Sequence, residues 1–145
     1  MKKEIIAIAV AAVVLVGLIL VFGVNAGETK VKFDRVSEKS TPREIEADIL
    51  PEYRELERAL AFKVGDQVYV MVTRGEKPTA GYDVKIEEIT LSSEDDKSIL
   101  TVKATFADPA DAENLAQVIC YPYDLVKTDL KGLPDSIQLQ AEFAK

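Results

Sequence analysis

The sequence predicts an α+β domain that is mainly antiparallel β. We expect about six strands, forming a sandwich or a curved sheet, with one packed amphipathic helix after an N-terminal transmembrane or signal helix. Three observations lead to this fold class. Apolar and polar residues alternate with a period of two in several stretches after residue 66. One apolar stripe between residues 50 and 60 has helical spacing. Ahead of both, residues 5–24 form a run without any charge.

The run "IIAIAVAAVVLVGLILVFGV" (residues 5–24) matches the thickness of a bilayer. As a helix it would span roughly 30 Å. Lys2 and Lys3 precede it, which orients the N-terminus toward the cytoplasm and the rest of the chain outside. The run is long for a signal peptide, but the small residues around Ala26 suit a cleavage site. Residues 1–26 are therefore predicted to be an anchor of a single-pass cell-membrane protein, or a signal peptide of a secreted one.

The next residues divide into a connection and a domain. Residues 27–41 are mostly charged and predict either a juxtamembrane linker or an edge strand, ahead of a β-rich domain over residues 42–145. Thr41-Pro42-Arg43-Glu44 has the residue types of a helix start. Pro51 is predicted to end that helix and to begin a second one of about three turns. Its apolar stripe should pack on the sheet and consists of Leu50, Tyr53, Leu56 and Leu60.

Strands are predicted from residue 67 onward. "QVYVMVTR" alternates, and so does the stretch from Tyr82 to Ile86. The apolar phase then slips so that Ile89 and Leu91 take over, which predicts a β-bulge near Glu87 and Glu88. After a turn in "SSEDDKS", further strands are predicted around Leu100–Phe106 and Ile137–Phe143.

The composition argues against catalysis. The chain has no histidine, which removes the most common general base and any Ser-His-Asp arrangement. Its one cysteine, Cys120, lies in an apolar strand-like run and is predicted to be a buried structural thiol. The net charge of −7 argues against nucleic acid as a partner. We expect a protein that is not an enzyme and that carries no cofactor and no metal.

Two segments need another explanation. The connection "GEKPTAGYDV" places about eight residues where a hairpin commonly has two to five. The segment "QVICYPYDLVK" places Pro122 within a predicted strand, where proline belongs at an edge or a bulge. The tyrosines on either side of Pro122 offer rings and hydroxyls to a partner.

These two segments resemble the C-terminal domain of the PrcB family, from about Gln67 to Lys127. The similarity rests on Gly75, Lys77, Pro78, Thr79, Gly81 and Tyr82, and on Gln117, Tyr121, Pro122 and Tyr123. Ala80 stands where the family usually has glycine. The resemblance implies a non-enzymatic extracytoplasmic interaction module, an accessory subunit of a surface protease complex, with a protease or another protein as its partner. The predicted partner-binding residues are Glu76, Lys77, Pro78, Thr79, Gly81, Tyr82, Tyr121, Pro122 and Tyr123.

The same loop is also similar to a loop of chagasin-type inhibitors, which insert into the clefts of cysteine proteases. Pro78, Thr79, Gly81 and Tyr82 carry this similarity. It implies an alternative function, a proteinase inhibitor that uses the loop 75–82. Proline restricts such a loop and its glycines permit bends. That composition suits a loop that packs against Tyr121 and Tyr123, and equally one that docks a partner.

Overall fold

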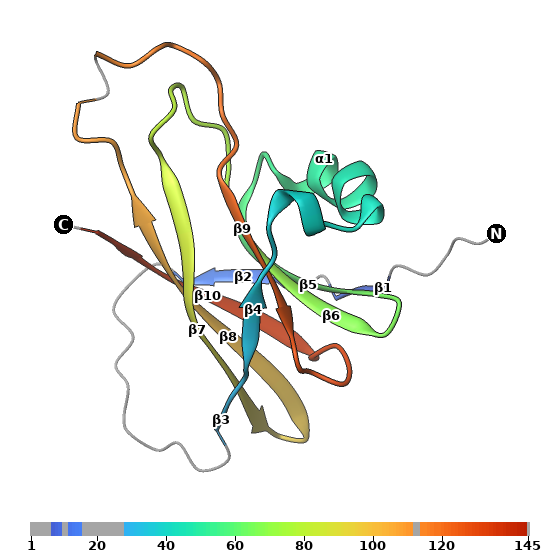
Figure 1. Cartoon of the computed structure of the whole chain (residues 1–145). Helices are drawn as coiled ribbons and strands as arrows, with labels where there is room; N and C mark the ends of the chain where they lie inside the picture. The colour runs from blue at the N-terminus through green and yellow to red at the C-terminus, as the bar shows by residue number, and fades with distance from the viewer. Residues whose placement is uncertain (1–6, 10–11, 16–27, 112–113, 145) are drawn as a thin grey trace.

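The computed structural model describes residues 7–9, 12–15, 28–111 and 114–144. Over residues 28–144, eight strands form two sheets that share one core (Figure 1). The first sheet has the order β1-β5-β6-β9-β4 and the second the order β2-β10-β8-β7-β3. The strands are β1 (Ala7–Ala9), β2 (Ala12–Leu15), β3 (Thr29–Lys30), β4 (Phe33–Arg35), β5 (Glu57–Val64), β6 (Gln67–Arg74), β7 (Asp83–Glu94), β8 (Lys97–Ala107), β9 (Tyr123–Thr128) and β10 (Ser136–Phe143). The predicted β-rich α+β class is confirmed, and residues 29–35 supply two short edge strands.

The predicted helix through Leu60 is wrong. A short 3-10 turn η1 (Glu38–Ser40) precedes the helical segment, which consists of η2 (Ile45–Ile49) and α1 (Leu50–Tyr53), and β5 begins at Glu57. Pro51 lies within α1 instead of separating two helices. Proline has no N–H to continue the α-helical ladder. The turn before it is widened, and the N–H of Leu50 bonds to the carbonyl of Ile45.

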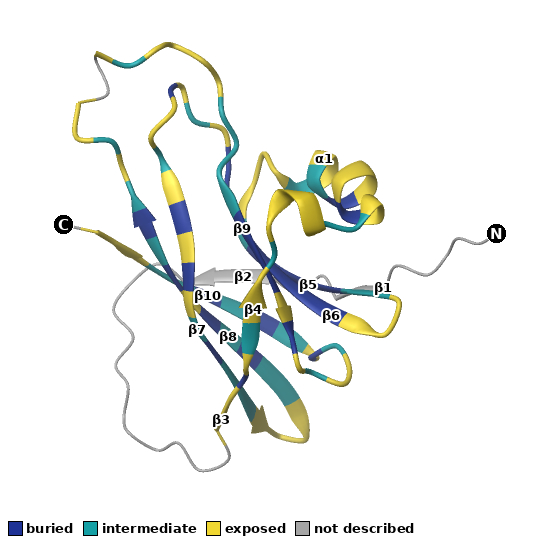
Figure 2. Ribbon diagram, in the orientation of Figure 1, coloured by how far each residue is buried: buried dark blue, intermediate teal, exposed yellow. Residues whose placement is uncertain are grey.

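The sequence predicted a helix through Leu60 because β5 is buried on both faces and has apolar residues at successive positions. Ala59 and Ala61 face the core between the sheets, whereas Leu60 and Phe62 pack against the helical segment. A short apolar run of this kind is compatible with a helix or with a covered strand. The same holds for β6, where Tyr69 and Met71 pack in one cluster with Ile45 and Ile49 of the helical segment. Figure 2 shows that β6 is buried along most of its length.

The structure of the second sheet agrees more closely with the predictions from the sequence. The predicted bulge is confirmed, because the register of β7 against β8 shifts between Ile86 and Glu88. The turn between these strands places Asp95 and Asp96 at φ values of 53° and 66°. Two pairings depart from the antiparallel prediction: β10 runs parallel to β8 from Ser136 to Phe143, and it also runs parallel to β2.

A charged pair ties the two sheets together beside the bulge. The Asp124 carboxylate at the start of β9 accepts bonds from the backbone N–H of Ile86 (2.8 Å) and of Leu125 (3.0 Å). It also accepts two bonds from Arg35 Nε, and Arg35 donates to the carbonyl of Ile86 at 2.8 Å. The hydrogen bond to Asp124 raises the pKa of Arg35. This cross-link fixes β9 against β7, and both strands lead to the loops described below.

The predicted helix over residues 5–24 falls mainly outside the described residues. Within that range, Ala7–Ala9 and Ala12–Leu15 are strands, β1 pairing with β5 and β2 with β10. Among the residues that the structure describes, no helix is both long and apolar enough to cross a membrane. The anchor and the signal peptide remain predictions.

Candidate functional site

Two long connections meet at one end of the sandwich (Figure 1). One is the loop 75–82 between β6 and β7, and the other is the segment 108–122 between β8 and β9. The two are joined through the backbone: the N–H of Lys77 donates to the carbonyl of Cys120 (2.8 Å), and the N–H of Cys120 donates to the carbonyl of Lys77 (2.9 Å). We call these two connections the loop end. The loop 75–82 is long because it continues the pairing of β6 beyond the end of the regular ladder.

The inside of the loop 75–82 is packed. Thr79 is 2% exposed, and its hydroxyl donates to the carbonyl of Ala80 at 2.9 Å. Gly81 has a φ of +97°, and a Cβ there would lie 2.8 Å from Cβ of Pro109 and 3.2 Å from Leu115 Cδ1. Only glycine combines this backbone conformation with so close an approach.

Ala80 is accommodated at the position where the family usually has glycine. The left-handed conformations in this loop fall on Gly75 and Gly81. Ala80 has no positive φ, and its side chain lies at the exposed surface. Alanine therefore introduces no backbone strain at this position.

Arg74, the last residue of β6, fixes the roots of both connections. Its side chain is 3% exposed and donates to the carbonyls of Asp83 (3.3 Å) and Ala107 (3.0 Å). It also forms an ion pair with Asp108 at 2.8 Å. The guanidinium lies 4.6 Å from the centre of the Phe106 ring. One buried cation thus connects the ends of β6 and β8 with the beginning of β7.

Sequence reasoning missed Arg74. A charged residue that follows an apolar strand and precedes a glycine is normally exposed, because charged side chains are rarely buried without partners. The partners that bury this one, Phe106 and Asp108, come from the far end of another strand. No local pattern in the sequence around Arg74 indicates that Phe106 and Asp108 pack against it.

The tyrosines of the predicted site are held by neighbouring charges. The guanidinium of Arg54 lies 4.3 Å from the centre of the Tyr121 ring, and the Tyr121 hydroxyl donates to Glu76 at 3.2 Å. Desolvation raises the pKa of Tyr121, and the hydrogen bond to Glu76 raises it further. Desolvation also raises the pKa of Tyr123. The raised pKa keeps both phenols protonated at neutral pH, and the Tyr121 hydroxyl is a hydrogen-bond donor.

The predicted residues come together around a shallow cavity of about 270 Å³. Its walls are formed by Ala80, Gly81, Tyr82, Asp83, Cys120, Tyr121, Pro122 and Tyr123. The other predicted residues lie beside it: Glu76 holds Tyr121, and Lys77 is paired with Cys120. Pro78 is exposed, and Thr79 is buried beneath the loop surface. All nine predicted residues therefore belong to one end of the molecule.

The predicted strand through Cys120 and Pro122 is wrong, because β9 begins only at Tyr123. Pro122 lies ahead of the strand, where its carbonyl accepts the N–H of Arg74 at 3.0 Å. The expected burial of Cys120 is also wrong, since this thiol is only half-buried. Val118 and Ile119 are 55% and 56% exposed. This apolar run resembles a core strand in sequence, but none of the described residues forms a second layer over it.

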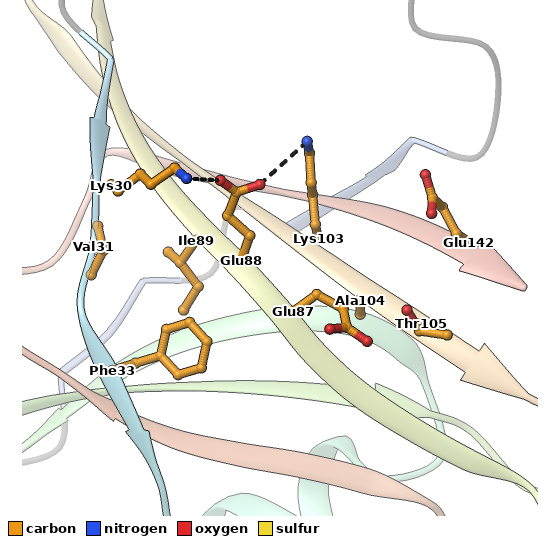
Figure 3. A pocket seen from close by; sticks show the side chains of 10 residues that line it. All are labelled: Lys30, Val31, Phe33, Glu87, Glu88, Ile89, Lys103, Ala104, Thr105 and Glu142. Carbon is orange, nitrogen blue, oxygen red and sulfur yellow. Dashed lines mark ion pairs between the residues drawn. The ribbon is translucent and has the colours of Figure 1, made fainter. Parts of the chain in front are cut away.

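A larger pocket of about 470 Å³ lies beside β3 and the bulge of β7 (Figure 3). Glu88 forms ion pairs there with Lys30 (3.2 Å) and Lys103 (3.4 Å). The hydrogen bonds from these lysines lower the pKa of Glu88. The lysines therefore neutralise this carboxylate, whereas Glu87 and Glu142 line the same pocket without an ion pair to the described residues. Within the described ranges, no group of three or more His, Cys, Asp and Glu side chains is placed to hold a metal ion.

A known family matches the part of the chain that contains the loop end and the strands on either side of its two connections. Residues 68–129 match the PrcB C-terminal family. The match includes both the loop 75–82 and the segment 108–122, so the resemblance stated from the sequence is confirmed over residues 68–129. No curated protein and no solved structure matches the chain.

Proposed function

We propose that this chain is a non-enzymatic interaction module outside the cytoplasm and that the loop end binds a protein partner. A role as an accessory subunit of a surface protease complex is the form that the PrcB resemblance suggests. The proposal rests on one observation above all. The loop end is fixed by paired backbone and by buried Arg74, yet it leaves Val118 and Ile119 more than half exposed.

Such an arrangement suits recognition. A prearranged surface loses little conformational entropy when a partner binds. The buried core of an interface is more apolar than the rest of a protein surface, and tyrosine is enriched among its central contacts. Val118 and Ile119 lie directly before Cys120, whose backbone is bonded to the loop 75–82. They are therefore held at a defined place instead of on a free segment.

The placement outside the cytoplasm rests on the sequence alone. Lys2 and Lys3 ahead of the apolar run favour export of everything that follows, whether the run is an anchor or a signal. N-terminal sequencing of the mature protein distinguishes the two. A start at Gly27 would show cleavage, and an intact N-terminus would show an anchor.

The inhibitor alternative needs a loop tip that can enter a cleft. The exposed Pro78 favours it. However, Lys77 and Gly81, on either side of this tip, are held by the segment 108–122. We therefore prefer a function in which a partner binds to the surface of the loop end over one in which the loop 75–82 inserts into a protease cleft. Submicromolar inhibition of a papain-like protease by the wild-type chain would reverse this preference.

The test uses affinity capture of the tagged full chain from its native envelope, with mass spectrometry of the co-purifying proteins. Val118→Asp places a charge on the exposed apolar pair, and we expect it to remove a partner, a protease among the candidates. Gly132→Asp is the matched control, because a side chain at Gly132 meets nothing within 4 Å and the residue lies in the connection from β9 to β10. An unchanged set of captured proteins in the Val118→Asp variant would refute the proposed binding surface.

A further inference from the structure

When only residues 28–144 are considered, without β1 and β2, the two sheets have four edges of two kinds. At one edge of each sheet lies a very short strand, β3 with two residues and β4 with three. These strands carry charged residues, Lys30 in β3 and Asp34 and Arg35 in β4. Short strands and charges are the usual means of preventing a sheet edge from pairing with another chain.

The other two edges lack this protection. β5 pairs with β6, and β10 with β8, over eight residues each without a break in register. Neither strand contains a proline. The centre of β5, Ala59–Phe62, is uncharged, and so is Ile137–Ala141 of β10. Long, regular edges with uncharged centres are the kind that accept an additional strand.

These two edges also lie beside each other. β5 and β10 belong to different sheets, but they contact each other on the same side of the sandwich. β1 pairs antiparallel with Ala61–Lys63 of β5, and β2 pairs parallel with Ile137–Gln140 of β10. Only residues 10–11 separate β1 from β2 in the sequence. A single extended segment is therefore enough to pair with both sheets.

We propose that the adjoining edges of β5 and β10 form a strand-acceptor site for an extended, uncharged segment of a partner protein. The segment pairs antiparallel with β5 and then parallel with β10, in the registers that β1 and β2 show. Backbone hydrogen bonds provide the affinity, and this mode tolerates varied side chains. Small and β-branched residues, as in "AIAVAAVVL", suit the strand conformation.

The site becomes free when residues 7–15 are elsewhere. These residues belong to the apolar run that is predicted to cross the membrane or to be cleaved. A residue in a membrane-spanning helix bonds within its own helix and cannot pair with a strand at the same time. In this respect the inference rests on the proposed extracytoplasmic placement, but it does not depend on the loop end.

The test uses the full chain inserted in lipid nanodiscs, with Cys120→Ser to remove the native thiol. The probe is a synthetic peptide of residues 6–16, flanked by lysines and carrying cysteine in place of Ala7. Because Ala7 pairs with Lys63 in the structure, Lys63→Cys should form a disulfide with the peptide. The matched control Glu57→Cys lies at the other end of the same strand, and there we expect the cross-link to be lost. Val118→Asp should leave cross-linking at Lys63→Cys unchanged, which separates this site from the loop end.

Three results would overturn the inference. The first is equal cross-linking of the peptide at Lys63→Cys and at Glu57→Cys, or no cross-linking at either position while the site is empty. Whether the site is empty is measured in a chain carrying both Ala7→Cys and Lys63→Cys. An internal disulfide there, without capture of the peptide by the single variant, would show that the chain's own segment fills the site permanently. A disulfide between two copies of the double variant would show exchange of the segment between copies.

Discussion

Two of the regions in which charged side chains hold strands together differ in how deeply the charges are buried. At the root of the loop end, the side chain of Arg74 is 3% exposed. At the bulge of β7, Glu88 is 31% exposed, and its partners Lys30 and Lys103 are 81% and 53% exposed (Figure 3). A buried ionic group that loses its partners is strongly destabilising, whereas exposed ion pairs contribute little because water and salt screen them. The Arg74 region should therefore determine stability, and the Glu88 region should only adjust it.

The largest expected effect is that of Arg74→Ala. The substitution removes the donor to two backbone carbonyls and leaves a cavity beside Phe106. We expect the free energy of unfolding to fall by about 3 kcal/mol, from the unpaired groups and the lost packing together. Urea unfolding followed by far-ultraviolet circular dichroism measures it. Arg54→Ala, which removes only a cation from the face of Tyr121, should cost less than about 1 kcal/mol. Equal losses in the two variants would contradict the comparison.

The second effect concerns the packing of the two connections at the loop end. Gly81→Ala introduces a Cβ at 2.8 Å from Pro109 and also strains a backbone with φ of +97°. Gly65→Ala is the matched control, with φ of +63° and nothing within 4 Å of the new Cβ. The control should cost roughly 1 kcal/mol from backbone strain, and Gly81→Ala at least about 1 kcal/mol more from the steric clash. If both variants have the same melting temperature, the segment 108–122 does not hold the loop.

A smaller effect separates the buried part of the loop 75–82 from its exposed tip. Thr79→Ala should lower the free energy of unfolding by about 1 kcal/mol, because it removes a buried side chain. Pro78→Ala should change it by less than about 0.5 kcal/mol, since the ring is exposed. Thermal unfolding of the two single variants checks the order. The reverse order would show that the tip is packed and that the inner face is free.

The smallest effect is expected at Glu88, and it depends on pH. Its pKa is lowered by Lys30 and then by Lys103, so the charged form is favoured in the folded state. The resulting stability is present above the unfolded pKa of about 4.3 and is lost as the pH falls through the lower folded pKa. At neutral pH Glu88→Gln should cost less than about 1 kcal/mol, and this difference should shrink in high salt.

Acid titration of unfolding provides the check for Glu88. The wild-type chain should lose its advantage over Glu88→Gln as the pH is lowered below about 4. Glu142→Gln is the control, since Glu142 lines the same pocket and forms no ion pair with the described residues. A difference between wild type and Glu88→Gln that is independent of both pH and salt would refute the electrostatic explanation.

The sequence by itself determined the local features of this protein. Alternation located β6, β7, β8 and β10, and the slip in phase located the bulge before Glu88. The Pro-Gly loop and the Tyr-Pro-Tyr segment identified the family of residues 68–129 and most of the cavity wall. These features depend on residues that are near one another in the chain, so a pattern of a few residues contains them.

Only the tertiary structure decided the rest. β5 was mistaken for a helix because the helical segment covers its second face, which no local pattern shows. Arg74 became the root of the loop end because Phe106 and Asp108 approach it from another strand. The exposure of Val118 and Ile119 has the same origin, since burial depends on whether another layer arrives to cover a residue. The alternation of residue types shows on which face of a strand a side chain lies. Whether that face is buried depends on the packing of segments that are distant in the sequence.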